Sequence, residues 1–535
     1  MSIKDFLNEL DASFERHKRD DERTISDWRV READARARAA ELRAIEAEGR
    51  ARANQIHEAE SRRNSNKATA FIDDPDDTDV LGGGRLGTLA DAKKDNLLNP
   101  NGLYLGFLEG KPLFYNGTDH LINYGKTRSG KGRDIVLPNL AHVFNRSLVV
   151  NDIKDGENAY ASAAYRASKG QRVIGINPHG LEIDGITSCR LNPFQRLIDK
   201  AQSGTDISAD AFQLCMSLIP PKKGDNEWVT DDAQLILATW LEWCAKFHPQ
   251  SCKLSEMWRF AHTQFDEDMA MILECENEKL AGQAQKIIGW KEAEKQWQAY
   301  QSALSKALRF FAPDTPLANV TDASDFDPAD LRHEKMTVYL MADSDLLEAC
   351  GSWISLTISA LVNTCAQTQG NVPVTFIIDE LANLPYMDVL PKALTLYAGK
   401  GIQIYGLCQG REALRDRGYK ESTIKNFEAQ SGIIHLWSIQ EKDLVDDVEK
   451  WSGMKTVPVK GVSQGGGAVA NAGMSLSYQK RAVLQSDDIY KVGDGQQIIN
   501  VVGKPYLYIA ERVPWFNVPN WAGVLKDVRK MHGLQ

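Results

Sequence analysis

The stretch Gly125-Lys-Thr-Arg-Ser-Gly-Lys-Gly132 decides the fold of this chain. It follows the apolar run His120-Leu-Ile-Asn-Tyr124 and precedes Asp134-Ile-Val-Leu, which can open a helix. A glycine-rich loop between a strand and a helix is the context of a phosphate-binding loop, because glycines let backbone N–H groups close around phosphate oxygens. The helix N-terminus adds a favourable dipole. We therefore predict a strand, a phosphate-binding loop and a helix at this position.

The residues of this loop have separate expected roles. Lys131 is expected to reach the β and γ phosphates of a nucleotide and to act in catalysis. Gly132 stands where such loops usually carry a Ser or Thr whose hydroxyl binds magnesium, so Thr127, Ser129 or a water molecule is left for that role. The alternative is a glycine- and lysine-rich surface turn. The predicted nucleotide contacts are Gly125, Thr127, Arg128, Ser129, Gly130, Lys131 and Gly132.

A second charged site is predicted where another apolar run ends. Val374-Thr-Phe-Ile-Ile378 has the pattern of a buried strand, and Asp379 and Glu380 follow it directly. Asp379 is expected to hold Mg²⁺ through water, and Glu380 to activate the attacking water as general base. Because a strand that ends in Asp-Glu is common, the alternative is a plain strand end, and the functional interpretation depends on the phosphate-binding loop.

Short apolar runs alternate with helical segments, which favours an α/β fold with a mainly parallel sheet covered by helices. Gln409 ends the run 402–408, so in a parallel sheet it emerges at the same carboxyl edge as Asp379. It is predicted to sense the γ phosphate during catalysis, and the alternative is a polar residue that caps a strand. Further strands are predicted at 104–108, 112–115, 120–124, 147–150, 172–176, 336–340, 374–378, 433–437 and 497–502.

Composition divides the chain into five predicted segments, which are 1–70, 71–118, 119–194, 195–310 and 311–535. The first is densely charged with high helix propensity, which indicates a solvated helix, with docking on a partner as the alternative. The second holds a turn-rich linker and leading strands. The third and fifth form a nucleotide-binding domain, and the fourth is an all-helical insertion into it. Residues 461–473 are glycine-rich and are predicted to be a surface loop, with a mobile hairpin as the alternative.

Charge and composition exclude several classes of protein. Lys and Arg number 63 against 73 Asp and Glu, a net charge of −10, so any DNA contact must be local. The scattered cysteines include no C-x-x-C pair, which argues against a zinc site and favours a reducing compartment. The N-terminus lacks the apolar core of a secretory signal. The charge-free stretch 349–378 contains Gly370 and Pro373, so we predict a helix, a turn and a strand rather than a membrane span.

These motifs resemble the type IV secretion coupling proteins of the TraG/TraD type, which are RecA-like pumps of conjugation systems. Residues 125–132 are similar to the family's G-x-T-R-x-G-K-G loop, which commonly ends in Gly. Residues 148–157 resemble its D-P-K-G-E segment, with Ile153 in place of the proline and one residue inserted before Glu157. The likeness covers residues 120–515, and weaker matches are Asn177-Pro178, Asn192-Pro193, 324–331, 481–488 and 503–505.

The resemblance implies a RecA-like P-loop ATPase with a mainly parallel central sheet, an inserted all-helical domain and an N-terminal helical extension. It implies ATP and Mg²⁺ as cofactors and a homo-hexameric ring threaded by DNA. It also implies a relaxase or other secretion substrate, and inner-membrane components of the type IV secretion system, as partners.

Two departures from the family pattern matter. Most members begin with two membrane-spanning helices, where this chain has a charged segment, so we expect a cytoplasmic protein that reaches the inner membrane peripherally, through a protein partner. Many members carry an Arg before the Gln-bearing strand that reaches a neighbouring subunit's nucleotide. Ala398 holds the matching position here, and Lys400 is the nearest cation.

The function predicted from the sequence is an ATP-hydrolysing coupling protein that recruits and translocates DNA or relaxase–DNA complexes in conjugative transfer. An FtsK/HerA-like translocase of double-stranded DNA outside conjugation is an alternative of the same class. A non-hydrolysing receptor, in which nucleotide only sets the shape of the helical domain, is an alternative of a different class.

Overall fold

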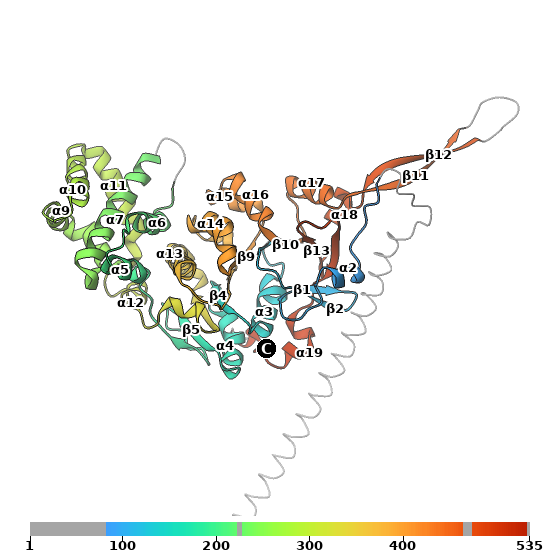
Figure 1. Ribbon diagram of the computed structural model, residues 1–535, viewed down its shortest axis with the longest axis horizontal. Coiled ribbons are helices and arrows are strands. Elements are labelled where there is room, and N and C mark those ends of the chain that lie inside the picture. The colour runs from blue at the N-terminus through green and yellow to red at the C-terminus, as the bar shows by residue number, and fades with distance from the viewer. Residues whose placement is uncertain (1–81, 222–226, 464–472, 532–535) are drawn as a thin grey trace, which may run out of the picture. The chain divides into compact units, whose positions relative to one another are not determined.

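A mostly parallel sheet runs through the computed structural model, which describes residues 82–221, 227–463 and 473–531 (Figure 1). The predicted N-terminal helix lies outside these residues. From one edge of the sheet to the other, the strands are β2 (Lys111–Tyr115), β1 (Leu103–Leu108), β14 (Leu507–Glu511), β13 (Gln496–Val501), β10 (Ser431–Trp437), β3 (His120–Gly125), β9 (Ile402–Cys408), β8 (Val374–Ile378), β4 (Ser147–Asp152), β7 (Met336–Met341), β5 (Arg172–Ile176) and β6 (Thr187–Ser188).

The strands from β10 to β6 run parallel, and those from β2 to β13 pair antiparallel. Central parallel strands are buried on both faces, which explains why they read as continuous apolar runs in the sequence. Every predicted strand is present, and the predicted α/β class with a mainly parallel sheet is confirmed. Within this sheet, β6 and β14 were not predicted.

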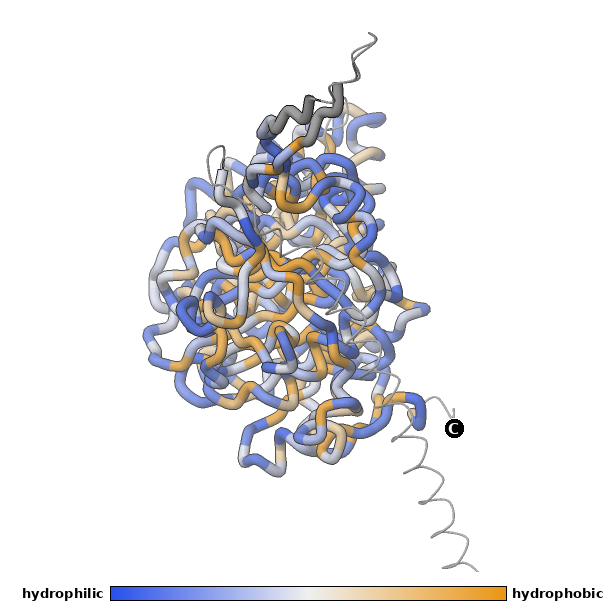
Figure 2. Tube along the Cα trace, turned by 90° about the vertical axis from the view of Figure 1, so that its right-hand side faces the viewer, coloured by the Kyte–Doolittle hydropathy of each residue, from blue (hydrophilic) through white to orange (hydrophobic). Residues whose placement is uncertain are grey.

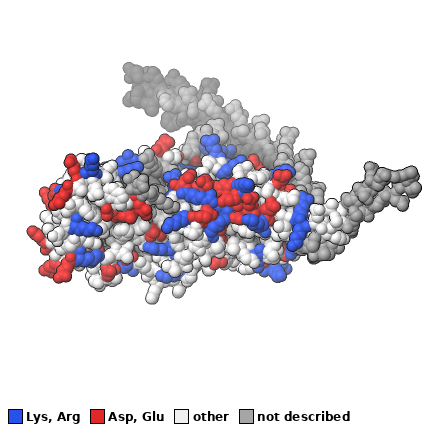
Figure 3. Space-filling model, turned by 90° about the horizontal axis from the view of Figure 1, so that it is seen from above, with Lys and Arg blue, Asp and Glu red and all other residues white. Residues whose placement is uncertain are grey.

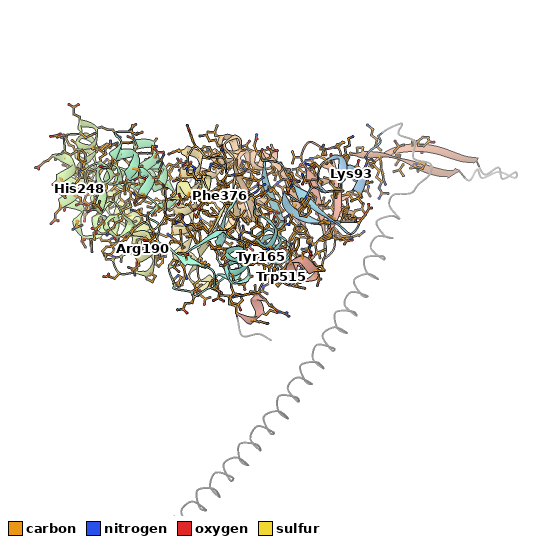
Figure 4. All side chains as sticks on the ribbon, turned by 60° about the horizontal axis from the view of Figure 1, so that its bottom comes forward. Lys93, Tyr165, Arg190, His248, Phe376 and Trp515 are labelled. Carbon is orange, nitrogen blue, oxygen red and sulfur yellow. The ribbon has the colours of Figure 1, made fainter. Side chains whose placement is uncertain are left out.

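Alternate residues of each central strand enter two different apolar cores. In β4, Leu148 and Val150 face one core and Val149 faces the other. The first core is covered by α3 (Leu137–His142), α4 (Glu157–Ser168) and α19 (Pro519–Ala522). The second is covered by α13 (Leu347–Gln367), α14 (Val389–Lys392), α15 (Arg411–Asp416), α16 (Glu421–Ala429) and α17 (Lys442–Trp451). In Figure 2 the hydrophobic segments, coloured orange, gather in the interior of the fold. Phe376 of β8 is buried and lies among densely packed side chains in Figure 4.

Helices fill the chain between β6 and β7, where the described residues form no strand. They are α5 (Gln195–Gln202), α6 (Ser208–Leu218), α7 (Glu227–Phe247), α8 (Leu254–Arg259), α9 (Phe265–Leu273), α10 (Glu278–Gly289), α11 (Glu294–Leu308) and α12 (Pro316–Thr321). Trp240 of α7 is buried and stacks on Phe260 with ring centroids 5.5 Å apart. The apolar core of these helices is continuous with the core on the α13 side of the sheet.

The charge-free stretch 349–378 forms most of α13, a turn and β8, which confirms that prediction. Among the described segments, none of the helices combines the length and apolarity needed to cross a membrane. A short helix, α2 (Leu89–Lys94), begins within the predicted linker, where Thr88 and Asp91 form a capping box. Six residues are too few to show a helical period in the sequence.

A separate two-stranded ribbon is formed by β11 (Met454–Ser463) and β12 (Gly473–Ala482). Its strands extend into both ends of the stretch predicted to be a surface loop, residues 461–473. The loop prediction is therefore wrong for residues 461–463 and 473. These residues form strands of a hairpin, as the alternative proposed. Residues 464–472 lie outside the described part of the chain.

Candidate active site

The glycine-rich loop connects β3 to a π-helical turn at Gly132–Val136, which continues into α3. The Lys131 side chain is buried inside this loop. Its ammonium donates hydrogen bonds to the carbonyl oxygens of Gly125, at 2.8 Å, and Lys126, at 3.3 Å. The loop therefore closes around the ammonium group of its own lysine, which places a positive charge at the centre of the loop.

Two of the loop glycines are under different constraints. Gly130 has φ of +91°, and a Cβ there would lie 3.0 Å from the Arg133 guanidinium, which forms a bidentate ion pair with Asp134. Glycine is needed at this position because other residues rarely adopt such a φ. At Gly132, by contrast, a Cβ would meet no atom within 4 Å. Steric space thus does not explain the missing Ser or Thr at Gly132.

The two acids follow β8 at the same carboxyl edge of the sheet. Asn151 of the neighbouring β4 fixes the backbone of Asp379, because its side chain accepts from the Asp379 N–H at 2.5 Å and donates to the Asp379 carbonyl at 2.8 Å. Glu380 has a left-handed backbone, with φ of +52°. A left-handed non-glycine residue costs about 1–3 kcal/mol and is typical of functional sites. This turn ends the strand.

Three predicted residues meet here, and a fourth residue joins them. The Lys131 ammonium lies 3.4 Å from the Glu380 carboxylate. Lys154, in the loop after β4, lies 2.9 Å from Asp379 and 3.8 Å from Glu380. The carboxylates are almost fully buried, so each needs a cation or hydrogen-bond donors nearby. Two ammonium groups and two carboxylates therefore form one compact cluster of ion pairs.

Several oxygen atoms of this site are buried and have no hydrogen-bond partner among the described residues. They are Oδ1 of Asp379, Oε2 of Glu380 and the hydroxyl of Ser129. Carboxylate and hydroxyl oxygens are the ligands that Mg²⁺ prefers, and buried polar atoms in proteins are normally satisfied. The free carboxylate oxygen of Asp379 thus fits a divalent cation.

Gln409 lies directly after β9, between the strands that lead to the two motifs. In the parallel register Cys408 pairs with Tyr124, which places Gln409 level with Gly125. Its side chain is exposed. Thr127 and Arg128 are exposed too, and within the described structure neither hydrogen-bonds to the acids. The fold thus brings Lys131, Asp379 and Glu380 together, whereas Gln409, Thr127 and Arg128 only border the site.

Arg512 reaches the loop and was not predicted. It follows β14, and its guanidinium donates to the Ser129 carbonyl at 2.6 Å while lying 4.6 Å from the centre of the Trp437 ring. Burial lowers its pKa. Arg512 stands 383 positions after Ser129, so no local sequence signal could have found it. Lys154 and Asn151, by contrast, lie in the segment that resembles D-P-K-G-E.

A buried ionic network begins at Tyr124 of β3, directly before the glycine-rich loop. Tyr124 donates to Glu428 at 2.7 Å, and Glu428 forms a bidentate ion pair with Arg411 at 2.6 and 2.8 Å. Arg411 also pairs with Asp447 of α17 at 2.8 Å. Further ion pairs of α15 to α17 adjoin this network, namely Arg415 with Glu412, Glu421 and Asp443, and Lys425 with Asp447. Figure 3 shows basic and acidic side chains closely mixed at the centre of the view.

Lys400, the candidate substitute for the family's trans-acting Arg, is already engaged within its own chain. Its ammonium donates to the Ala366 carbonyl at the end of α13, at 3.0 Å, and lies 5.3 Å from the centre of the Tyr397 ring. We therefore assign Lys400 no role at a neighbouring nucleotide.

Comparison with known proteins shows the family. The sequence profile of the family described as "Type IV secretory system Conjugative DNA transfer" matches residues 53–532. The chain belongs to this family. The resemblance seen in its motifs is thereby confirmed.

Two relatives illustrate how much of the family protein this chain spans. Protein VirD4 of Rhizobium radiobacter is 24% identical over 399 residues, which cover 72% of this chain and 56% of that protein. Conjugal transfer protein TraG of Escherichia coli is 21% identical over 467 residues, which cover 76% of this chain and 70% of that protein. The chain therefore spans little more than half the length of this VirD4.

Solved structures support the fold of this family member. The plasmid coupling protein TrwB in complex with ADP and Mg²⁺ matches with a TM-score of 0.60 and 15% identity, over 81% of this chain and 94% of that one. The unbound bacterial conjugative coupling protein TrwB matches with a TM-score of 0.59. The likeness confirms the predicted RecA-like fold.

Proposed function

We propose that this member of the conjugative DNA transfer family is an ATP-hydrolysing coupling protein. It would use ATP and Mg²⁺ to recruit and move DNA, or a relaxase–DNA complex, through a type IV secretion system. The 3.4 Å approach of Lys131 to Glu380 carries this proposal, because it joins a phosphate-binding lysine to a carboxylate placed as a general base. The TrwB complexes with ADP and Mg²⁺ and with a non-hydrolysable ATP analogue support the choice of nucleotide.

The chain's own residues would divide the chemistry as follows. Backbone N–H groups of the loop bind phosphate oxygens, and the Lys131 ammonium neutralises charge that develops on the transferred phosphoryl group. Glu380 accepts the proton of the attacking water. Gln409, level with the start of the loop, orients that water or senses the γ phosphate. Mg²⁺, held by Asp379 through water, supplies positive charge to the phosphates when it is bound.

The geometry of Glu380 favours a motor over a receptor. A protein that only senses nucleotide needs no general base, yet Glu380 is held buried by a left-handed backbone and faces the loop lysine. Backbone strain of this kind persists when the surrounding structure supports it, as at catalytic sites. The same feature does not separate a conjugative pump from an FtsK/HerA-like translocase, and family membership supports the former.

Local positive charge supports the DNA contact. The chain is acidic as a whole, but Lys455 and Arg481 lie directly opposite each other on the β11–β12 ribbon. Like charges in directly opposite positions are unfavourable in a sheet, so an anion between them would stabilise the ribbon. A DNA phosphate has the required charge.

Assembly and location complete the proposal. We propose that this protein assembles into a ring of six identical chains and that DNA passes through the channel of the ring. The partners would be a relaxase or other secretion substrate and inner-membrane components of the secretion system. The protein would be cytoplasmic and bind the inner membrane peripherally, through one of these partners.

Phosphate release during a titration with DNA, together with mass measurement of the assembled species, tests this function. The proposal predicts ATP hydrolysis that DNA stimulates, by a species of six chains. Lys131→Ala is the matched inactive control. ATP binding without hydrolysis, at any DNA concentration, would instead identify a nucleotide-gated receptor.

A further inference from the structure

Among the ion pairs of the site, the one between Lys154 and the carboxylate of Asp379 is the closest. Its ammonium lies 2.9 Å from Oδ2 of Asp379 and 3.8 Å from Oε1 of Glu380. The Lys154 side chain is 40% exposed, whereas those of Asp379 and Glu380 are 2% and 8% exposed. The lysine therefore lies between the two carboxylates and the solvent, and its partly exposed side chain can change its rotamer.

The backbone beneath Lys154 is fixed on both sides. Ile153 is buried in the core, and Asp155 accepts a hydrogen bond from the Ser344 N–H at 2.8 Å. Gly156 follows with a left-handed backbone at the start of α4. A change at this position is therefore a swing of the lysine side chain rather than a movement of the loop.

Charge balance indicates when that swing occurs. The ammonium groups of Lys131 and Lys154 pair with the two carboxylates as the site stands, and Glu157 adds negative charge near Lys154. A divalent cation beside Asp379 would add two positive charges a few ångströms from the Lys154 ammonium, and like charges at that distance repel strongly in a poorly solvated site. Nucleotide phosphates add negative charge that outweighs this repulsion. The cation would thus be admitted with nucleotide and opposed without it.

We propose that Lys154 is a positioning residue that occupies the acids in the absence of nucleotide and is displaced when a divalent cation arrives with nucleotide. Lys154 orders Asp379 and Glu380 and keeps free metal off them. This inference rests on the proposed function, since it concerns the same site. Its distinctive consequence is a weak affinity for metal alone, which a purely structural ion pair would not require.

Metal binding by the full chain tests the proposal, with Mn²⁺ as the probe and free Mn²⁺ counted by its electron paramagnetic resonance signal. Lys154→Met should bind Mn²⁺ without nucleotide at least about tenfold more tightly than the wild type, because one repelling charge is gone. Lys154→Arg keeps the charge and should behave like the wild type. Lys169→Met is the matched control. It removes an exposed lysine directly after the C-terminal end of α4, whereas Lys154 precedes the N-terminal end of the same helix.

Unchanged or weaker Mn²⁺ binding by Lys154→Met would overturn the proposal. Lys154→Gln provides a second neutral variant if the first fails to fold, and must show the same gain. Binding of ADP to the wild type, measured separately, distinguishes this outcome from failure of the proposed function. A wild type without ADP affinity would refute the nucleotide site, whereas ADP binding with unchanged metal affinity in the variants would refute only the role of Lys154.

Discussion

Lys131 and Glu380 lie 3.4 Å apart although β9 separates the strands that lead to them. Their meeting depends on parallel strands that end at one edge and on a left-handed turn at Glu380. Ligands of open α/β sheets bind at this edge. The topology of the sheet, rather than proximity in sequence, thus assembles the site.

Glycine is expected to be required at position 130 and not at position 132. Gly130→Ala should lower the free energy of unfolding by about 1–3 kcal/mol, because alanine at φ of +91° is strained and its Cβ would crowd Arg133. Gly132→Ala, the matched control, has open space and a helical position, so its stability should be unchanged or slightly higher. Chemical denaturation of both variants measures this, and equal losses would contradict the prediction.

Arg512 is expected to support nucleotide binding through the Ser129 carbonyl. Arg512→Lys keeps the charge but lacks the planar guanidinium. That group donates to the Ser129 carbonyl and at the same time lies over the Trp437 ring. We expect about a tenfold loss of ADP affinity, the scale of one charged hydrogen bond, measured by calorimetry. Arg529→Lys, at an exposed arginine that pairs with Asp527, is the control and should bind ADP normally. Normal affinity in Arg512→Lys would show that this contact is dispensable.

The fold was largely predictable because its signals are local. Runs such as 374–378 are buried on both faces of a parallel sheet and therefore stay apolar along their whole length. The loop at residues 125–132 and the pair Asp379-Glu380 each follow such a run. Their types and spacing were enough to predict a common site.

Other features were not predictable because they depend on contacts that are distant in sequence. The order of the strands places β9 between β3 and β8, and no local pattern encodes that order. Arg512 joins the loop from the antiparallel end of the sheet. The β11–β12 ribbon was missed because the glycine-rich residues 461–473 read as a loop, whereas its strands form through pairing of residues 454–463 with residues 473–482.

Buried His435 is expected to make stability depend on pH. Its ring bonds Tyr405 and Gln497, and burial lowers its pKa from 6.5 to about 4. The unfolded chain therefore takes up a proton below pH 6.5 that the folded chain refuses until about pH 4, so stability is lost as the pH falls through this window. Between pH 7 and pH 5 this single group should contribute about 2 kcal/mol of destabilisation.

Comparison with His435→Gln isolates that contribution. The variant should show a pH dependence of the unfolding free energy that is smaller by about 2 kcal/mol over the same interval, because glutamine does not titrate. Denaturant melts of both proteins at pH 7 and pH 5 provide the measurement. Equal losses of unfolding free energy in the two proteins would mean that His435 takes up its proton as readily in the folded as in the unfolded chain, which would contradict the prediction.

The most direct test of the central claim is single-turnover hydrolysis of ATP by Glu380→Gln beside the wild type, with bound ATP measured in the same samples. The variant keeps the shape of the side chain but cannot accept a proton. We predict that it binds ATP as the wild type does and hydrolyses it at least about a hundredfold more slowly. Wild-type turnover in the variant, or loss of ATP binding with the fold intact, would contradict the assignment of Glu380 as general base.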